Sequence, residues 1–99
     1  MKVIFLFAIL FVAGCATHLD PLTYRPRNYA GPAWVITASV NTLNNEIIVS
    51  IDGNTVIKDN LSFFDGTGEF VQKYQGHTVH VSCHNECTLR INNEYVGKF

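Results

Sequence analysis

Hydrophobic and polar residues alternate with a period of two over most of the chain from Trp34 onward. Turn-forming residues interrupt this alternation roughly every eight to ten positions, a spacing typical of short β-strands. The first such segment has two distinct faces, with Trp34, Ile36, Ala38 and Val40 on one and Val35, Thr37 and Ser39 on the other. We therefore predict an all-β fold, a small antiparallel sandwich or partly closed barrel of about seven or eight short strands.

The pair Asp52-Gly53 is a turn signal of the two-residue hairpin kind, because both residue types tolerate positive φ. The β-branched segments on either side of it would then pair as antiparallel strands. This loop predicts that Val49 lies opposite Val56 and that Ile48 lies opposite Ile57.

A second hairpin is predicted around residues 84–86, taken as a three-residue loop. Its register is specified by side-chain character, because a slip by one residue would mix apolar and polar faces. One face pairs Cys83 with Cys87, Val81 with Leu89 and Val79 with Ile91, and the other pairs Ser82 with Thr88, His80 with Arg90 and Thr78 with Asn92.

The N-terminal segment has the layout of a secretory signal. Lys2 adds positive charge, and residues 3–12 carry neither charge nor strongly polar groups. The fourteen residues from Val3 to Ala16 would span about 21 Å as a helix, at about 1.5 Å per residue. A bilayer core is about 30 Å thick, so a signal segment is favoured over a transmembrane helix.

The segment Val12-Ala13-Gly14-Cys15 resembles the lipobox of bacterial lipoproteins, in which an aliphatic residue and two small residues precede a cysteine. The resemblance covers only residues 1–15. It implies diacylglycerol transfer to Cys15, cleavage between Gly14 and Cys15, and acylation of the new amino group, commonly with palmitate. Ala16 in place of aspartate is similar to the pattern for export to the outer membrane, provided that the host is Gram-negative.

These features divide the chain into residues 1–14 as lipoprotein signal peptide, residues 15–33 as lipidated cysteine and tether, and residues 34–99 as the β-domain. The tether is predicted from its prolines, which remove backbone donors and favour extended conformations: Pro21, Pro26 and Pro32. Arg27 and its neighbours in this segment are interpreted as solvated linker residues, with contact to anionic headgroups or to a partner as the alternative.

Export also bears on the cysteines. With Cys15 acylated, Cys83 and Cys87 remain as an even pair outside the cytoplasm, which predicts a disulfide.

Once Lys2 is removed with the signal, six lysines and arginines stand against eight carboxylates. No basic face of the kind that nucleic acid requires is present, so no nucleic-acid partner is expected.

Two groups of residues suggest chemistry at first sight. A metal site is suggested by His77, His80, Cys83, His84 and Cys87. On a strand His77 and Cys83 share a face while His80 points away, so we expect neither a metal nor a cofactor. Glycoside hydrolysis needs paired carboxylates, but those available are interpreted as turn residues: Asp52, Asp59, Asp65 and Glu69.

The domain is rich in aromatic residues, which form either the core or an exposed patch for a partner or glycan, with the core favoured: Phe63, Phe64, Phe70, Tyr74, Tyr95 and Phe99. No motif of a catalytic site is present, so we do not expect an enzyme. The sequence favours a membrane-anchored envelope lipoprotein whose β-domain is a binding module of unknown specific role, with an envelope protein as one candidate partner. The alternatives are a small enzyme or metal carrier, or a structural accessory subunit of an envelope complex.

Overall fold

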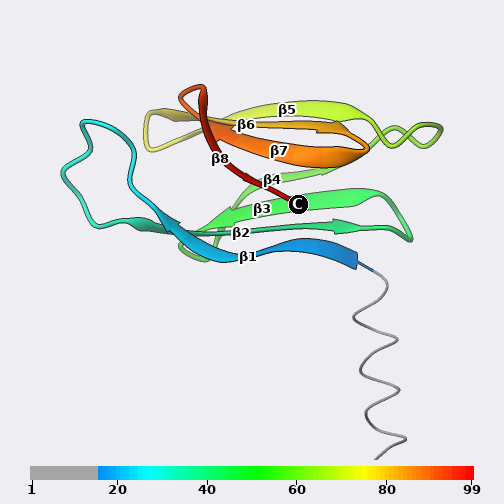
Figure 1. Ribbon diagram of the computed structural model, residues 1–99, viewed down its shortest axis with the longest axis horizontal. Coiled ribbons are helices and arrows are strands. Elements are labelled where there is room, and N and C mark those ends of the chain that lie inside the picture. The colour runs from blue at the N-terminus through cyan, green and yellow to red at the C-terminus, as the bar shows by residue number, and fades with distance from the viewer. Residues whose placement is uncertain (1–15) are drawn as a thin grey trace, which may run out of the picture.

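The computed structural model describes residues 16–99, which form eight strands in two four-stranded antiparallel sheets (Figure 1). The strands are β1 (Ala16–Tyr24), β2 (Trp34–Asn41), β3 (Glu46–Ile51), β4 (Asn54–Asn60), β5 (Gly68–Tyr74), β6 (His77–His84), β7 (Glu86–Ile91) and β8 (Glu94–Lys98). Each strand pairs with the next along the chain, except that the chain passes from one sheet to the other between β4 and β5. Two architectures were predicted, a sandwich and a partly closed barrel, and the structure is the sandwich.

The core lies between the two sheets and follows the predicted alternation. On β2 the residues of the Trp34 face are buried, and those of the opposite face are exposed or partly exposed. Both sheets contribute aliphatic side chains that are fully buried, among them Ile36, Ile47, Val49, Ile51, Val79, Val81, Leu89 and Ile91. Each such side chain contributes about 1.5–3 kcal/mol by leaving water, so the sandwich is stabilised chiefly by this layer.

The cysteine hairpin of β6 and β7 has the predicted register. Cys83 lies opposite Cys87, and the apolar pairs Val81 with Leu89 and Val79 with Ile91 follow along the same face. Asn85 adopts the left-handed conformation that the loop needs, with a φ of 69°. The two cysteines form a disulfide across the strands, with their Cα atoms 4.0 Å apart.

The Asp52-Gly53 turn forms as predicted, with φ values of 52° and 81°, but the register beyond it is not the predicted one. A β-bulge at Val56 shifts the pairing, so that Val49 lies opposite Ile57 and Ile48 lies opposite Lys58. The bulge places Ile57 on the core face, where only 2 % of it is exposed.

The tether predicted over residues 15–33 is wrong for residues 16–24, because Ala16–Tyr24 is strand β1 and pairs with β2. Pro21 is accommodated at a bulge, where it and Asp20 lie opposite the single residue Thr37 of β2. Leu19, Leu22 and Tyr24 pack against the core, which offsets the cost of ordering the strand. The β-domain therefore begins at Ala16 rather than at residue 34, and residues 25–33 connect β1 to β2.

The predicted signal peptide, its cleavage site at Gly14 and the lipidated Cys15 lie outside the described residues. Within residues 16–99 no helix is long and apolar enough to cross a membrane.

Replacing both Cys83 and Cys87 by alanine should lower the free energy of unfolding by about 2 kcal/mol, because the disulfide closes only a short loop. The protein should still fold, since the flanking pairs of β6 and β7 remain. Urea denaturation of the double variant measures the loss, with Ser82→Ala on the polar face as the control. Loss of all cooperative unfolding would contradict this account.

Deleting residues 16–32 should destabilise the domain by on the order of 3 kcal/mol, because the core then loses Leu19, Leu22 and Tyr24. Thermal unfolding of a chain spanning residues 33–99 should be compared with that of a chain spanning residues 16–99. Equal melting temperatures would mean that β1 contributes nothing to the sandwich.

Candidate binding site

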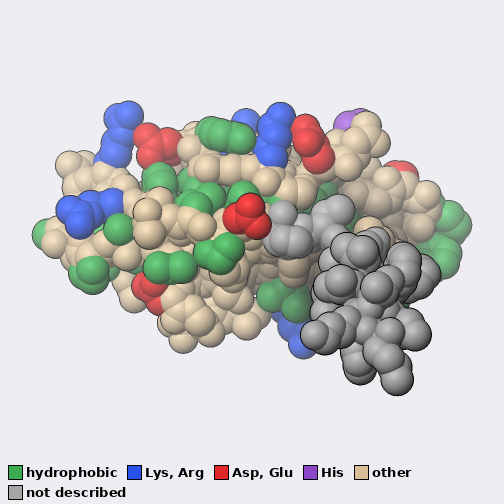
Figure 2. Space-filling model, turned by 60° about the horizontal axis from the view of Figure 1, so that its bottom comes forward, with side chains coloured by type: hydrophobic (Ala, Val, Ile, Leu, Met, Phe, Trp, Pro, Cys, Tyr) green, Lys and Arg blue, Asp and Glu red, His purple; other side chains and the backbone are tan. Residues whose placement is uncertain are grey.

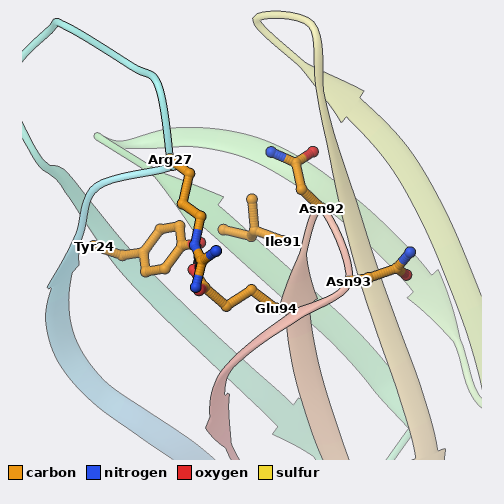
Figure 3. A pocket seen from close by; sticks show the side chains of 6 residues that line it. All are labelled: Tyr24, Arg27, Ile91, Asn92, Asn93 and Glu94. Carbon is orange, nitrogen blue, oxygen red and sulfur yellow. Dashed lines mark hydrogen bonds and ion pairs between the residues drawn. The ribbon is translucent and has the colours of Figure 1, made fainter.

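A pocket of about 340 Å³ opens at the end of the sandwich where β1 stops and where β7 turns into β8 (Figure 3). Its lining combines one apolar residue with five that carry hydrogen-bonding groups: Ile91, Tyr24, Arg27, Asn92, Asn93 and Glu94. The site thus joins residues from opposite ends of the described chain.

The turn at Asn92-Asn93 shapes one wall of the pocket. Both residues have positive φ, 52° and 68°, which asparagine tolerates and which a two-residue hairpin loop requires. This places Ile91 opposite Glu94. Asn92 is also tied to β6, because its amide donates to the Thr78 carbonyl and its Oδ1 accepts from the Thr78 amide at 3.0 Å.

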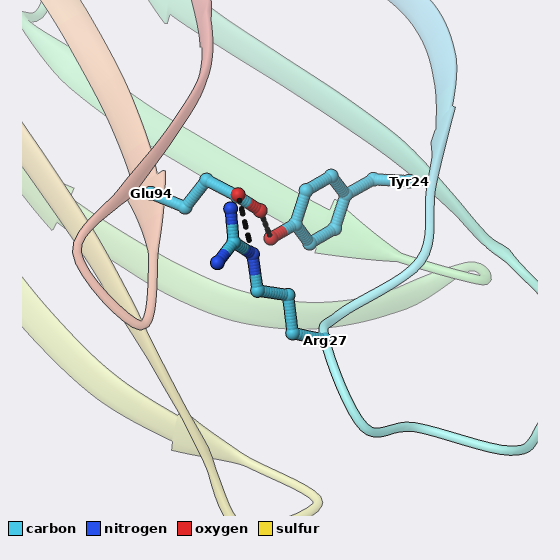
Figure 4. A network of polar contacts seen from close by, with 3 residues as sticks. All are labelled: Tyr24, Arg27 and Glu94. Carbon is cyan, nitrogen blue, oxygen red and sulfur yellow. Dashed lines mark hydrogen bonds and ion pairs between the residues drawn. The ribbon is translucent and has the colours of Figure 1, made fainter.

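Glu94 is the centre of a three-residue polar network (Figure 4). The Tyr24 hydroxyl donates a short hydrogen bond to Oε1 of Glu94, and Nε of Arg27 donates to Oε2 at 3.2 Å. The carboxylate therefore links the end of β1 and the following loop to the start of β8. Because Arg27 and Glu94 carry opposite charges, the network is neutral overall.

The network shifts the pKa values of two of its members. Partial burial, together with the adjacent Glu94 carboxylate, raises the pKa of Tyr24 to about 12. The hydrogen bond from Tyr24 and the nearby charge of Arg27 lower the pKa of Glu94. At neutral pH, Tyr24 is therefore protonated and Glu94 is ionised.

A cluster of rings lies beside the pocket at the same end of the sandwich. The buried Trp34 ring lies edge-on to Tyr74 and His77, with centroids 5.2 and 5.3 Å away, and Tyr29 covers it at 5.6 Å. The side-chain Nδ2 of Asn92 lies 2.9 Å from Nδ1 of His77, which joins this cluster to the pocket wall. The wall is thus held by packing and does not depend on a ligand for its shape.

The residues suggested as metal ligands do not converge. His77 belongs to the ring cluster, His80 lies 3.0 Å from Oε1 of Glu69, and the Cys83–Cys87 disulfide leaves no thiolate to coordinate a metal. In the part of the chain that the structure describes, no group of three or more histidine, cysteine or acidic residues could hold a metal ion.

Of the suggested carboxylates, Asp59 and Glu69 line one pocket of about 200 Å³ between β4 and β5, whereas Asp52 and Asp65 do not line it. Asp52 accepts from the Val35 amide at 2.9 Å, Asp59 accepts from the amide of Asn60, and Asp65 accepts from Thr67 within its own loop.

The aromatic residues divide between the two predicted roles. Packing against the core involves Phe70, Tyr74 and Phe99, whereas Phe63, Phe64 and Tyr95 are exposed.

Sequence reasoning did not find this pocket. The Asn92-Asn93 pair is a hairpin signal, so the turn itself was recognisable. The contact between Tyr24 and Glu94 spans 70 positions and has no local signature. Arg27 was interpreted as a solvated linker residue. It is solvated, since 85 % of its side chain is accessible, but it also forms an ion pair with Glu94, which was not predicted.

Comparison of the chain with protein-family models, with curated protein sequences and with solved structures finds no match in any of the three.

Tyr24→Phe removes the hydroxyl that Glu94 accepts from and should lower the free energy of unfolding by about 1 kcal/mol at neutral pH. The stabilisation by Tyr24 is fully present below pH 10.0, its ordinary pKa, and is lost as pH rises towards about 12. At the acid end, stabilisation through Glu94 is present above its ordinary pKa of 4.5 and is lost as pH falls through its lowered value.

The stability difference between wild type and Tyr24→Phe should therefore be constant between about pH 5 and 10 and shrink on both sides. Urea denaturation at several pH values measures it. Tyr95→Phe, on an exposed tyrosine outside the network, is the matched control and should show no such profile. A difference that does not vary with pH would contradict the assigned network.

Proposed function

We propose that this protein is a small envelope lipoprotein, anchored through acylated Cys15, whose β-sandwich binds an envelope protein at the Tyr24–Arg27–Glu94 pocket. The observation that carries the binding role is this preformed, charge-balanced pocket, walled by a hairpin turn and a packed ring cluster. The anchor is supported by the lipobox resemblance of residues 12–15.

The protonation states in the pocket favour binding over catalysis. An efficient general acid or base has a pKa near the working pH. Tyr24 and Glu94 are shifted away from neutrality in opposite directions, so neither exchanges a proton readily at pH 7. The lining also contains one carboxylate, whereas glycoside hydrolysis uses two.

The chemistry of the lining suits a protein segment with exposed amide groups. Asn93 is exposed, and its side-chain amide offers both a donor and an acceptor. Arg27 uses its Nε for Glu94, so its outer amino groups face solvent and can bind carbonyl or carboxylate oxygens. Ile91 lies beneath this lining and is fully buried in the core. Arginine and tyrosine are both enriched where interfaces gain most of their affinity.

Photo-crosslinking in living cells tests this function. A photoreactive residue at Asn93 should yield a crosslinked product with one envelope protein, and the same residue at Val71, exposed on β5, should not. Arg27→Ala should reduce the product about tenfold, which is the loss of about 1.4 kcal/mol of binding. Cys15→Ser in parallel should abolish palmitate incorporation and membrane partition.

Equal crosslinking from Asn93 and Val71, or a product unaffected by Arg27→Ala, would remove the pocket from the proposal. Palmitate labelling that persists in Cys15→Ser would remove the anchor. The two parts are thus tested separately.

A further inference from the structure

The three most exposed of the large hydrophobic side chains in residues 16–99 lie at the end of the sandwich opposite the pocket. Phe64 is 95 % exposed, Phe63 is 88 % exposed and Leu43 is 80 % exposed. Figure 2 shows hydrophobic side chains protruding at the right-hand end, where Figure 1 places the turn between β4 and β5. Exposed apolar side chains grouped in this way mark an interaction surface more often than scattered ones do.

The two phenylalanines lie in a loop, residues 61–67, that is closed by hydrogen bonds within its own backbone. The Ser62 amide donates to the Thr67 carbonyl at 2.8 Å, and the Gly66 amide donates back to the Ser62 carbonyl at 2.9 Å. The rings of Phe63 and Phe64 lie edge to face with centroids 5.9 Å apart. The loop backbone is therefore closed, and it presents both rings to solvent.

Leu43 belongs to the same surface because its turn is bonded to this loop. The Leu61 amide donates to the Asn45 carbonyl at 2.8 Å, and the side-chain amide of Asn60 donates to the Asn44 carbonyl at 3.0 Å. We call the surface formed by Leu43, Phe63 and Phe64 the apolar tip.

The apolar tip lies at the end where β1 begins. Ala16, the first residue of β1, pairs with Asn41 at the end of β2, directly before the turn that carries Leu43. In the order β1-β2-β3-β4, three strand spacings of about 4.8 Å separate Ala16 from the end of β4. Cys15 is therefore joined to the sandwich about 15 Å from the loop of Phe63 and Phe64.

We propose that the apolar tip inserts into the phospholipid surface that holds acylated Cys15, so that the sandwich stands on the membrane with its pocket facing away. The inference rests on the anchor in the proposed function. Because β1 begins at the residue after Cys15, no tether separates the sandwich from its lipid. An anchor at Cys15 then brings this end of the sandwich to the bilayer interface, where phenylalanine and leucine are favourable.

The charges at this end favour neutral lipid contact over an electrostatic one. Lys98 is paired with Glu86 at 3.1 Å, and Asp65 directs its carboxylate to the amide and hydroxyl of Thr67. Lys58 is exposed two residues before the end of β4, so a single lysine lies near the tip without forming a cluster of cations for anionic headgroups. Insertion of the tip should therefore occur in zwitterionic bilayers and should be insensitive to salt.

Tryptophan fluorescence of the full, lipidated protein tests the insertion. The protein is reconstituted into phosphatidylcholine vesicles with and without bromine on the acyl chains, which quenches tryptophan at the hydrocarbon boundary. Phe64→Trp should lose about half or more of its added emission, because interfacial apolar side chains enter about 5–10 Å into the headgroup/acyl boundary. Native Trp34, buried at the pocket end, is a common reference in every sample.

Val71→Trp is the matched control, since Val71 is exposed on the outer face of β5, and its added emission should be unchanged. Vesicle flotation and intact mass report the anchor independently of quenching. An acylated protein that floats while Phe64→Trp stays unquenched overturns the insertion and leaves the anchor intact.

An unacylated Cys15 in the intact mass overturns the anchor and the insertion together. A third outcome is that brominated lipid does not quench Phe64→Trp, and that an added envelope protein shields it from aqueous iodide. This outcome would assign the tip to a protein partner and overturn its insertion into lipid.

Discussion

The burial of one apolar face of each sheet against the other is the constraint on which this structure depends. Within residues 16–99 every buried side chain of the core cluster is hydrophobic or a disulfide cysteine, and no charged or polar residue is fully buried. The layer therefore gains its stability from apolar burial, and its desolvation cost includes Nε1 of Trp34, which is buried without a hydrogen-bond partner. The β-bulges also maintain this layer. The bulge near Pro21 keeps Leu22 directed towards the core, and the bulge at Val56 does the same for Ile57.

The antiparallel order of the strands separates the two candidate surfaces. Because successive strands run in opposite directions, consecutive connections alternate between the two ends of the sandwich. The turns after β2, β4 and β6 meet at the end where β1 starts, and a small hollow of about 140 Å³ there is lined by residues of all three, including Thr42, Gly66 and Asn85. The turns after β1, β3, β5 and β7 meet at the other end, which holds the pocket and the rings.

The sequence predicted the features that depend on alternation and on turn chemistry. The register of the cysteine hairpin followed from its face-to-face pairs, and the faces of β2 followed from the spacing of its apolar residues. The assignment of residues 16–24 failed because the prolines suggested a linker, whereas Leu19 and Leu22 could be recognised as core residues only once a partner strand was known. The pocket was hidden for a similar reason, because Tyr24 and Glu94 meet only after both sheets have formed.

Because residues 16–24 form a strand and not the predicted tether, the range of partners that the pocket could reach is different. A tether would have let the domain tumble freely above the membrane, and Arg27 could then have met lipid headgroups. With β1 beginning directly after Cys15, an eight-residue strand such as β2 holds the two ends of the sandwich about 27 Å apart. The polar region on each side of a bilayer is only about 5–8 Å thick, so in the proposed orientation, with the sandwich standing on its apolar tip, the Arg27–Glu94 pair would lie beyond the headgroups. That orientation would favour a protein over a lipid as the occupant of the pocket.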